Sequence, residues 1–168
     1  MSELLSESNL LNEKRGGTLK VLAILSWVGI GIMLLLTLFS ALGGPLSDEE
    51  LERQKIEALE AITPEMLEVF GTELVEENIA ILEATQQKFY SITGLKLANL
   101  ILGAYAVFLM FNLKKRGFFL YLVYSAVPVA STLYFFGTGP LMTFWVALII
   151  VFSILFCTLY AFQLKRMS

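Results

Sequence analysis

Long apolar runs separated by short polar segments dominate the pattern of this 168-residue chain. Four of the runs are long enough to cross the hydrocarbon core of a bilayer, roughly 30 Å thick, which takes about 20 helical residues. Because backbone polar groups find no water in lipid, each run is predicted to form a helix. The predicted spans cover residues 21–42, 94–113, 117–136 and 141–164. The sequence therefore predicts an all-α fold, an integral membrane four-helix bundle.

Residues 45–90 form the one long polar segment, and their pattern predicts amphipathic helices between the first two spans. Ser47 and Glu50 have the spacing of a capping box, which marks a helix start. Thr63 and Pro64 predict a second helix start, and Gly71 predicts where that helix stops. A third helix is predicted from residue 72, and its apolar spacing is compatible with an unbroken run into the second span.

The positions of lysine and arginine predict the orientation, because cytoplasmic loops of inner-membrane proteins carry an excess of these residues. Arg53, Lys55 and Lys88 fall on one side of the four spans, with Lys96 at the lip of the second span. We therefore predict a bacterial cytoplasmic (inner) membrane protein with a cytoplasmic leader (1–20), a cytoplasmic tail (165–168) and an extracytoplasmic segment (45–90). The eight bases of the predicted cytoplasmic side are Lys14, Arg15, Lys20, Lys114, Lys115, Arg116, Lys165 and Arg166.

The composition agrees with a membrane location and excludes several classes of protein. Hydrophobic residues make up 57% of the chain and charged residues 16%, against about 45–50% and 25% in a typical soluble domain. A soluble chain of this length cannot bury so much apolar side chain, so a soluble enzyme is excluded. The formal net charge of −3 opposes nucleic-acid binding, which needs a basic face.

The residue types that are missing restrict the chemistry of the chain. It contains no histidine, which removes imidazole ligation of haem, the usual histidine zinc sites and a histidine general base. Its single cysteine, Cys157, allows neither an internal disulfide nor a cysteine metal cluster. We therefore predict no catalytic residue, no metal site and no cofactor, and we do not expect an enzyme.

Twelve of the fifteen acidic residues lie within residues 45–90, which also hold three bases and so carry a net charge of −9. One interpretation is a cap that docks a partner or binds a cation. The simpler interpretation, which we favour, is a solvated acidic face over an apolar stripe that packs on the outer end of the bundle. The candidate docking residues lie on the predicted third helix and are Glu73, Glu76, Glu77 and Glu83.

Small and polar residues recur at steps of three or four in the spans. One interpretation is a set of stripes that converge on a polar pathway. The other is helix–helix packing, in which small residues allow close approach and hydroxyl or amide groups bond across the seam. We favour packing, because one asparagine and a few hydroxyls make a weak pore lining. The candidate residues are Ser26, Gly29, Thr37, Asn99, Gly103, Ser125, Pro128 and Thr132.

The mid-chain turn KKRGF (residues 114–118) and the later Pro128 resemble features of small four-span inner-membrane proteins of Bacteroidota. Residues 18–31 and 89–128 carry the resemblance, which extends over most of the chain. The resemblance implies the four-span topology and implies no activity.

Together these patterns predict a multi-pass membrane protein that contacts the lipid bilayer and either a protein partner or further copies of itself. The predicted function is a non-enzymatic scaffold or accessory subunit that acts through helix packing and its acidic external cap. The alternative is a small channel or transporter component formed by oligomerisation. A membrane enzyme that uses carboxylates of the cap is the third and least favoured interpretation, because none of these groups is clearly paired.

Overall fold

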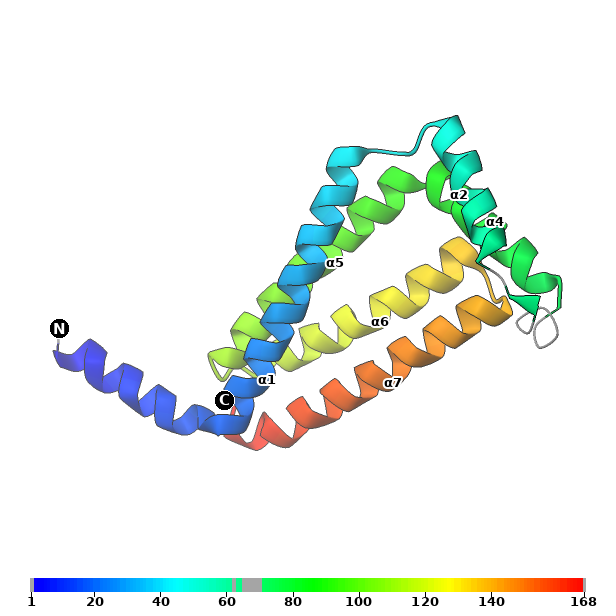
Figure 1. The fold of residues 1–168 in the computed structure, drawn as a ribbon. Helices are drawn as coiled ribbons and strands as arrows, with labels where there is room; N and C mark the ends of the chain where they lie inside the picture. The colour runs from blue at the N-terminus through cyan, green and yellow to red at the C-terminus, as the bar shows by residue number, and fades with distance from the viewer. Residues whose placement is uncertain (1, 62, 65–70, 168) are drawn as a thin grey trace.

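The structure of the protein, a computed structural model, describes residues 2–61, 63, 64 and 71–167. These residues form helices and connections and contain no strand (Figure 1). The predicted all-α fold is therefore confirmed. The elements are α1 (Ser2–Gly43), α2 (Asp48–Glu60), α4 (Glu73–Gln87), α5 (Phe89–Phe111), α6 (Arg116–Phe136), α7 (Pro140–Gln163) and the short 3₁₀ helix η1 (Leu164–Arg166).

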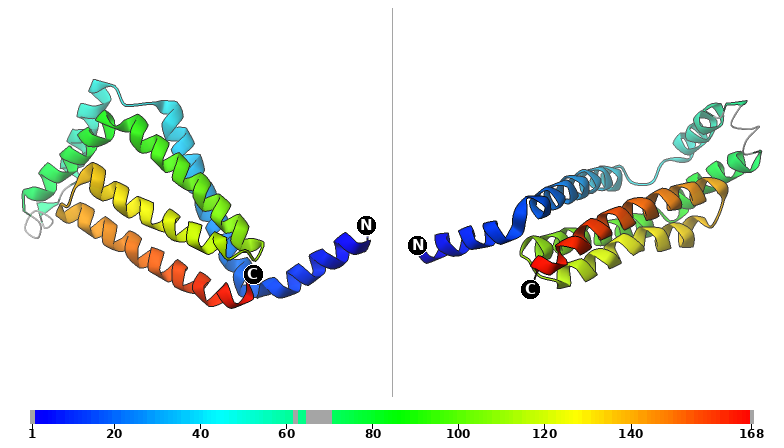
Figure 2. Two further views of the ribbon diagram at one scale, coloured as in Figure 1. Left: turned by 180° about the vertical axis from the view of Figure 1, so that it is seen from behind. Right: turned by 90° about the horizontal axis from the view of Figure 1, so that it is seen from below.

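Four helical stretches are long and apolar enough to cross a membrane. They are Gly17–Gly43 of α1 and the whole of α5, α6 and α7. Each stretch overlaps one predicted span, although the second begins at Phe89 rather than at residue 94, so the chain is a multi-pass membrane protein. The first part of α1 continues beyond its span and projects away from the bundle (Figures 1 and 2).

The four spans form a wedge. α1 packs along α5 and α6 packs along α7, while α5 and α6 join the two pairs. The pairs meet at the end of the bundle that holds the C-terminus and the α5–α6 connection, and they diverge toward the other end (Figures 1 and 2). We call the first the narrow end and the second the wide end. α2 and α4 lie across the wide end (Figure 1).

The hydrophobic core lies at the narrow end. Leu19 of α1, Val107 and Met110 of α5, and Tyr160 of α7 are fully buried there and belong to one cluster. Lipid tails are as apolar as these side chains, so close van der Waals packing rather than escape from water holds such a cluster together. The narrow end is therefore closed by tight packing, whereas the wide end depends on other contacts.

A tight turn joins α5 to α6 at the narrow end. Leu113 adopts a φ of 60°, and its N–H donates to the Met110 carbonyl while the Lys114 N–H donates to the Leu109 carbonyl, each at 2.9 Å. These two bonds form a Schellman motif, whose left-handed position is usually occupied by glycine. The Leu113 side chain is buried in the core cluster, and this packing offsets the backbone strain.

The helix at the wide end breaks where α4 meets α5. α4 ends at Gln87 and α5 begins at Phe89, with Lys88 between them at φ −110° and ψ 19°. An unbroken run from residue 72 into the second span is therefore wrong. No glycine or proline occupies the break. The chain bends there because α4 lies across the opening, where it contacts α6 and α7.

The polar segment follows its predicted pattern in part. The capping box that starts α2 is confirmed: Ser47 N–H donates to a Glu50 carboxylate oxygen at 3.0 Å, and Glu50 N–H donates to Ser47 Oγ at 3.3 Å. The helix predicted to start at Thr63 and Pro64 falls mainly on residues outside the described ranges. Gly71, its expected stop, has a φ of 68°, a left-handed conformation that suits glycine.

Replacing Gly117 with alanine should destabilise the junction of α5 and α6. A Cβ at this position would lie 2.6 Å from the Met110 nitrogen and 2.7 Å from the Ala106 oxygen, which are backbone atoms of a packed helix. Overpacking of this kind costs about 1–3 kcal/mol, measurable as the free energy of unfolding in detergent micelles. Gly31→Ala is the control, because nothing lies within 4 Å of its Cβ position. Equal losses in the two variants would contradict the close approach.

Candidate functional site

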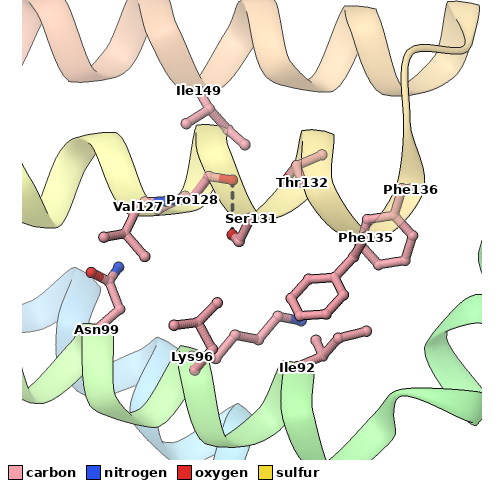
Figure 3. A pocket seen from close by; sticks show the side chains of 11 residues that line it. Ile92, Lys96, Asn99, Val127, Pro128, Ser131, Thr132, Phe135, Phe136 and Ile149 are labelled. Atoms are coloured by element: carbon pink, nitrogen blue, oxygen red, sulfur yellow. Dashed lines mark hydrogen bonds between the residues drawn. The ribbon is translucent and has the colours of Figure 1, made fainter.

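Two adjacent cavities lie inside the wedge. The larger has a volume of about 870 Å³ and is lined by all four spans. The smaller has a volume of about 210 Å³ and lies mainly between α5 and α6 (Figure 3). Both linings include Lys96, Asn99, Pro128 and Ile149. Because they share these residues, we treat the two as one site, the wedge cavity.

The structure brings together most of the small and polar residues that the sequence singled out. Thr132 lines the smaller cavity. Gly103 lies outside both linings, and the ring of Tyr124 covers it so closely that a Cβ would come within 2.5 Å of a ring carbon. Three of the spans therefore turn their polar residues toward one space. The sequence candidates that line the larger cavity are Ser26, Gly29, Thr37, Asn99, Ser125 and Pro128.

Asn99 and Pro128 are linked by the backbone chemistry of α6. A proline inside a helix has no N–H, so the carbonyl four residues earlier loses its helical donor. In α6 that carbonyl belongs to Tyr124, and the Asn99 side-chain amide donates to it at 3.3 Å. The amide thus supplies the missing donor across the α5–α6 interface, as expected of a proline inside a membrane helix. Asn99 is 9% exposed, and its Oδ1 has no hydrogen-bond partner among the described residues.

A cluster of tyrosines closes the cavity toward the narrow end. Ser26 Oγ and Tyr160 Oη are hydrogen-bonded at 2.9 Å. The Tyr121 ring packs between those of Tyr160 and Tyr124, with centroid separations of 5.0 and 5.4 Å. Burial of a tyrosine requires a partner for its hydroxyl, and Ser26 provides one for Tyr160. The pairing of Ser26 with Tyr160 was not predicted from sequence, since two hydroxyls 134 positions apart leave no local signal.

The α7 wall of the cavity was also missed. It consists of apolar or aromatic side chains such as Trp145, Ile149 and Phe152, together with Ser153. A helix this apolar around its whole circumference has no polar stripe that would show which face points inward. A wall of this kind can be identified only once the neighbouring helices are placed.

Charge is distributed unevenly over the site. Lys96 is the basic residue among the described residues of both linings, and no acidic residue occurs among the described residues that line either cavity. The acidic residues gather instead on α2 and α4, which we call the acidic platform. Within the described part of the chain, no group of three or more histidine, cysteine, aspartate or glutamate residues is arranged to hold a metal ion.

Polar contacts join the two helices of the platform. Lys55 of α2 lies 2.8 Å from Glu52 and 3.0 Å from Glu83 of α4, and its side chain is 18% exposed. The hydrogen bonds to Glu52 and then Glu83 raise the pKa of the Lys55 ammonium. In the capping box, the hydrogen bond from the Ser47 backbone lowers the pKa of Glu50. The Leu46 N–H, in the connection between α1 and α2, donates to the Gln86 side chain at 3.0 Å and ties this connection to α4.

Glu77 joins the platform to the bundle. Its carboxylate accepts hydrogen bonds from the N–H groups of Leu141, at 2.7 Å, and Met142, at 2.9 Å. These are among the first N–H groups of α7, which have no acceptor within their own helix. The negative charge also lies at the positive end of the α7 dipole. Gly139 lies directly against the carboxylate and leaves no room for a Cβ.

The four candidate docking residues fall into two groups. Glu77 and Glu83 bond within the chain, to α7 and to Lys55. Glu73 and Glu76 are exposed on α4, and none of the ion pairs found in the described part of the chain involves them. The first pair thus holds the platform in place, and the second pair is presented on its surface.

Comparison with known protein families, with curated proteins and with solved structures finds no match to this chain.

Removing the Glu77 carboxylate should destabilise the wide end. Glu77→Ala leaves two N–H groups of α7 without their acceptor, and a lost cap of this kind costs about 0.5–2 kcal/mol. The free energy of unfolding in detergent micelles measures this loss. Glu76→Ala, one residue earlier and exposed, should lie within about 0.5 kcal/mol of the wild type. Indistinguishable stabilities of the two variants would contradict the capping role.

Proposed function

We propose that the protein is a non-enzymatic accessory or scaffold subunit of a membrane assembly, and that it binds its partner on the acidic platform. The observation that carries this proposal is the attachment of α4: Glu77 bonds to α7, and Gln86 bonds to Leu46 in the connection between α1 and α2. A platform fixed to the bundle in this way loses little conformational entropy when a partner binds, so more of the interaction energy appears as affinity.

Charge indicates the chemistry of the partner. Glu73 and Glu76 are exposed one turn apart on α4, and the acids of residues 45–90 outnumber the bases by nine. Complementary charge speeds encounter and suppresses wrong partners. The proposed partner therefore presents a basic surface, and it is either another protein or a basic region of a second copy.

The proposed orientation places the platform outside the cytoplasm of a bacterial cell, in the inner membrane. Its support is the separation of charge along the wedge. Lys20, Lys114, Lys115 and Lys165 belong to segments at the narrow end, whereas the platform acids lie at the wide end. The excess of bases on cytoplasmic segments then assigns the narrow end to the cytoplasm.

A channel or transporter component is the second candidate, and the wedge cavity is the observation that favours it. A single chain in this conformation has a closed narrow end, because Val107, Met110 and Tyr160 are fully buried there. Transport would thus require a second conformation or an oligomer. Saturable solute flux into liposomes that contain the purified protein would favour this candidate over the accessory subunit.

A cysteine at position 76 tests orientation and function together. In a Cys157→Ser background, Glu76→Cys should react with a membrane-impermeant thiol photo-crosslinker in intact spheroplasts, and illumination should give one discrete adduct. Adding Glu73→Lys should reduce the adduct severalfold, because it reverses a neighbouring charge. Lys114→Cys should react only after lysis.

Each step of this experiment has its own contradicting result. Reaction of position 76 only after lysis would contradict the orientation. Efficient labelling that yields no discrete adduct, or an adduct insensitive to Glu73→Lys, would contradict a partner bound on the platform.

A further inference from the structure

We propose that the wedge cavity is a binding site for one anionic phospholipid whose head group carries a hydroxyl, of the phosphatidylglycerol type. The phosphate pairs with Lys96, and the acyl chains lie between α1 and α7. This site is separate from the acidic platform, and the lipid proposal does not depend on whether the platform binds a partner.

The cavity has the form that such a ligand requires. Its volume of about 870 Å³ falls in the range of roughly 300–1,000 Å³ that is usual for ligand pockets. Leu36 of α1 and Phe152 of α7 both line it, yet they are 59% and 58% exposed. The cavity is therefore open sideways between α1 and α7, at membrane depth, where an acyl chain can enter from the bilayer.

Two cations lie near the cavity at the wide end. Lys96 lines both parts of it and extends toward Phe135 (Figure 3). Lys88 Nζ lies over the ring of the same Phe135, 5.7 Å from its centroid. The ion pairs found in the described part of the chain use Arg53 and Lys55 and neither of these lysines.

Lys96, which is exposed within the span formed by α5, is placed to pair with an anion from outside the chain. An unpaired charge within a membrane-spanning helix is costly, and no carboxylate lines the cavity among the described residues. A phosphate at the level of Lys96 supplies the missing charge. It can accept charge-assisted hydrogen bonds from the ammonium.

Asn99 is the second, independent indication of a ligand. It is 9% exposed and lines both parts of the cavity, and its Oδ1 is buried with no partner in the described part of the chain. The bond from its Nδ2 to the Tyr124 carbonyl fixes the amide, so a flip would leave that carbonyl unbonded. A buried acceptor without a donor is expensive. A head-group hydroxyl supplies a donor with only a local side-chain adjustment.

The polar atoms also distinguish a lipid from a transmembrane helix of a second copy. A helix laid between α1 and α7 would cover the apolar walls, but its backbone donors are already used within the helix. It would bring no anion to Lys96 unless it carried an acid at that depth, and the membrane spans of this chain contain no acid at all. The occupant that matches both Lys96 and Asn99 is thus an anionic lipid with a hydroxyl.

Native mass spectrometry of the purified protein in detergent, titrated with single lipids, tests this proposal. We expect one phosphatidylglycerol per chain, bound about tenfold more tightly than phosphatidylcholine, because the choline cation cancels the charge of the phosphate beside Lys96 and phosphatidylcholine has no head-group hydroxyl. Lys96→Met should reduce this preference severalfold, to the part that the hydroxyl contributes, and Lys96→Arg should preserve it. Lys114→Met, which removes a base at the narrow end, should leave it unchanged. Helical circular dichroism and thermal midpoints establish that each variant is folded.

Phosphatidylmethanol is the matched lipid control, because it keeps the phosphate charge and lacks the hydroxyl. It should bind severalfold more weakly than phosphatidylglycerol if a hydroxyl bonds to Asn99. A wild-type protein with no preference for phosphatidylglycerol over phosphatidylcholine would overturn the site. An undiminished preference in folded Lys96→Met would also overturn it, and so would a dimer that binds no lipid. Equal binding of phosphatidylglycerol and phosphatidylmethanol would overturn the role of Asn99.

Discussion

The carboxylate of Glu77 is the contact on which the shape of this molecule depends. It bonds to the first N–H groups of α7, 64 and 65 positions along the chain, and so fixes α4 across the wide end of the wedge. Apolar packing cannot do this, because membrane helices gain little from burying apolar surface against one another rather than against lipid. A charged cap on a helix terminus is directional. It therefore helps to hold α4 across the wide end, where the two helix pairs diverge from the packed core of the narrow end.

The same geometry explains the polar groups within the membrane. At the narrow end, the Ser26–Tyr160 bond and the tyrosine rings complete a packed core. Toward the wide end the helices separate, and Pro128 frees a carbonyl that Asn99 must satisfy. Asn99 meets this need with its amide nitrogen, and its oxygen is buried with no donor among the described residues. Asn99 and Lys96 both line the space between α1 and α7, and Lys96 joins none of the ion pairs found in the described part of the chain, although the rest of the lining is largely apolar.

The spans and most of the cavity lining could be predicted because lipid imposes simple rules on sequence. An apolar run of sufficient length must be helical, and polar residues within it stand out, which is why Ser26, Thr37 and Asn99 were identified. The role of Glu77 could not be predicted, since its partners lie far away in sequence and its neighbours are also acids. The break at Lys88 has no glycine or proline to mark it, because tertiary contacts of α4 impose it. The inward face of α7 could not be recognised from the sequence, because apolar residues occur all round this helix.

The central claim is that the spans diverge from a closed narrow end to a wide end held apart by α4. Pulsed electron–electron double resonance in lipid nanodiscs measures the distances between α1 and α7 at the two ends. It uses two pairs of spin labels in a Cys157→Ser background. One pair, at Val21 and Phe162, lies near the narrow end, and the other, at Leu42 and Phe144, lies near the wide end; all four positions are exposed. The account predicts a narrow distance distribution for each pair, with the longer distance at the wide end, and a broadened wide-end distribution in Glu77→Ala. Equal distances at the two ends, as in a parallel bundle, would contradict it.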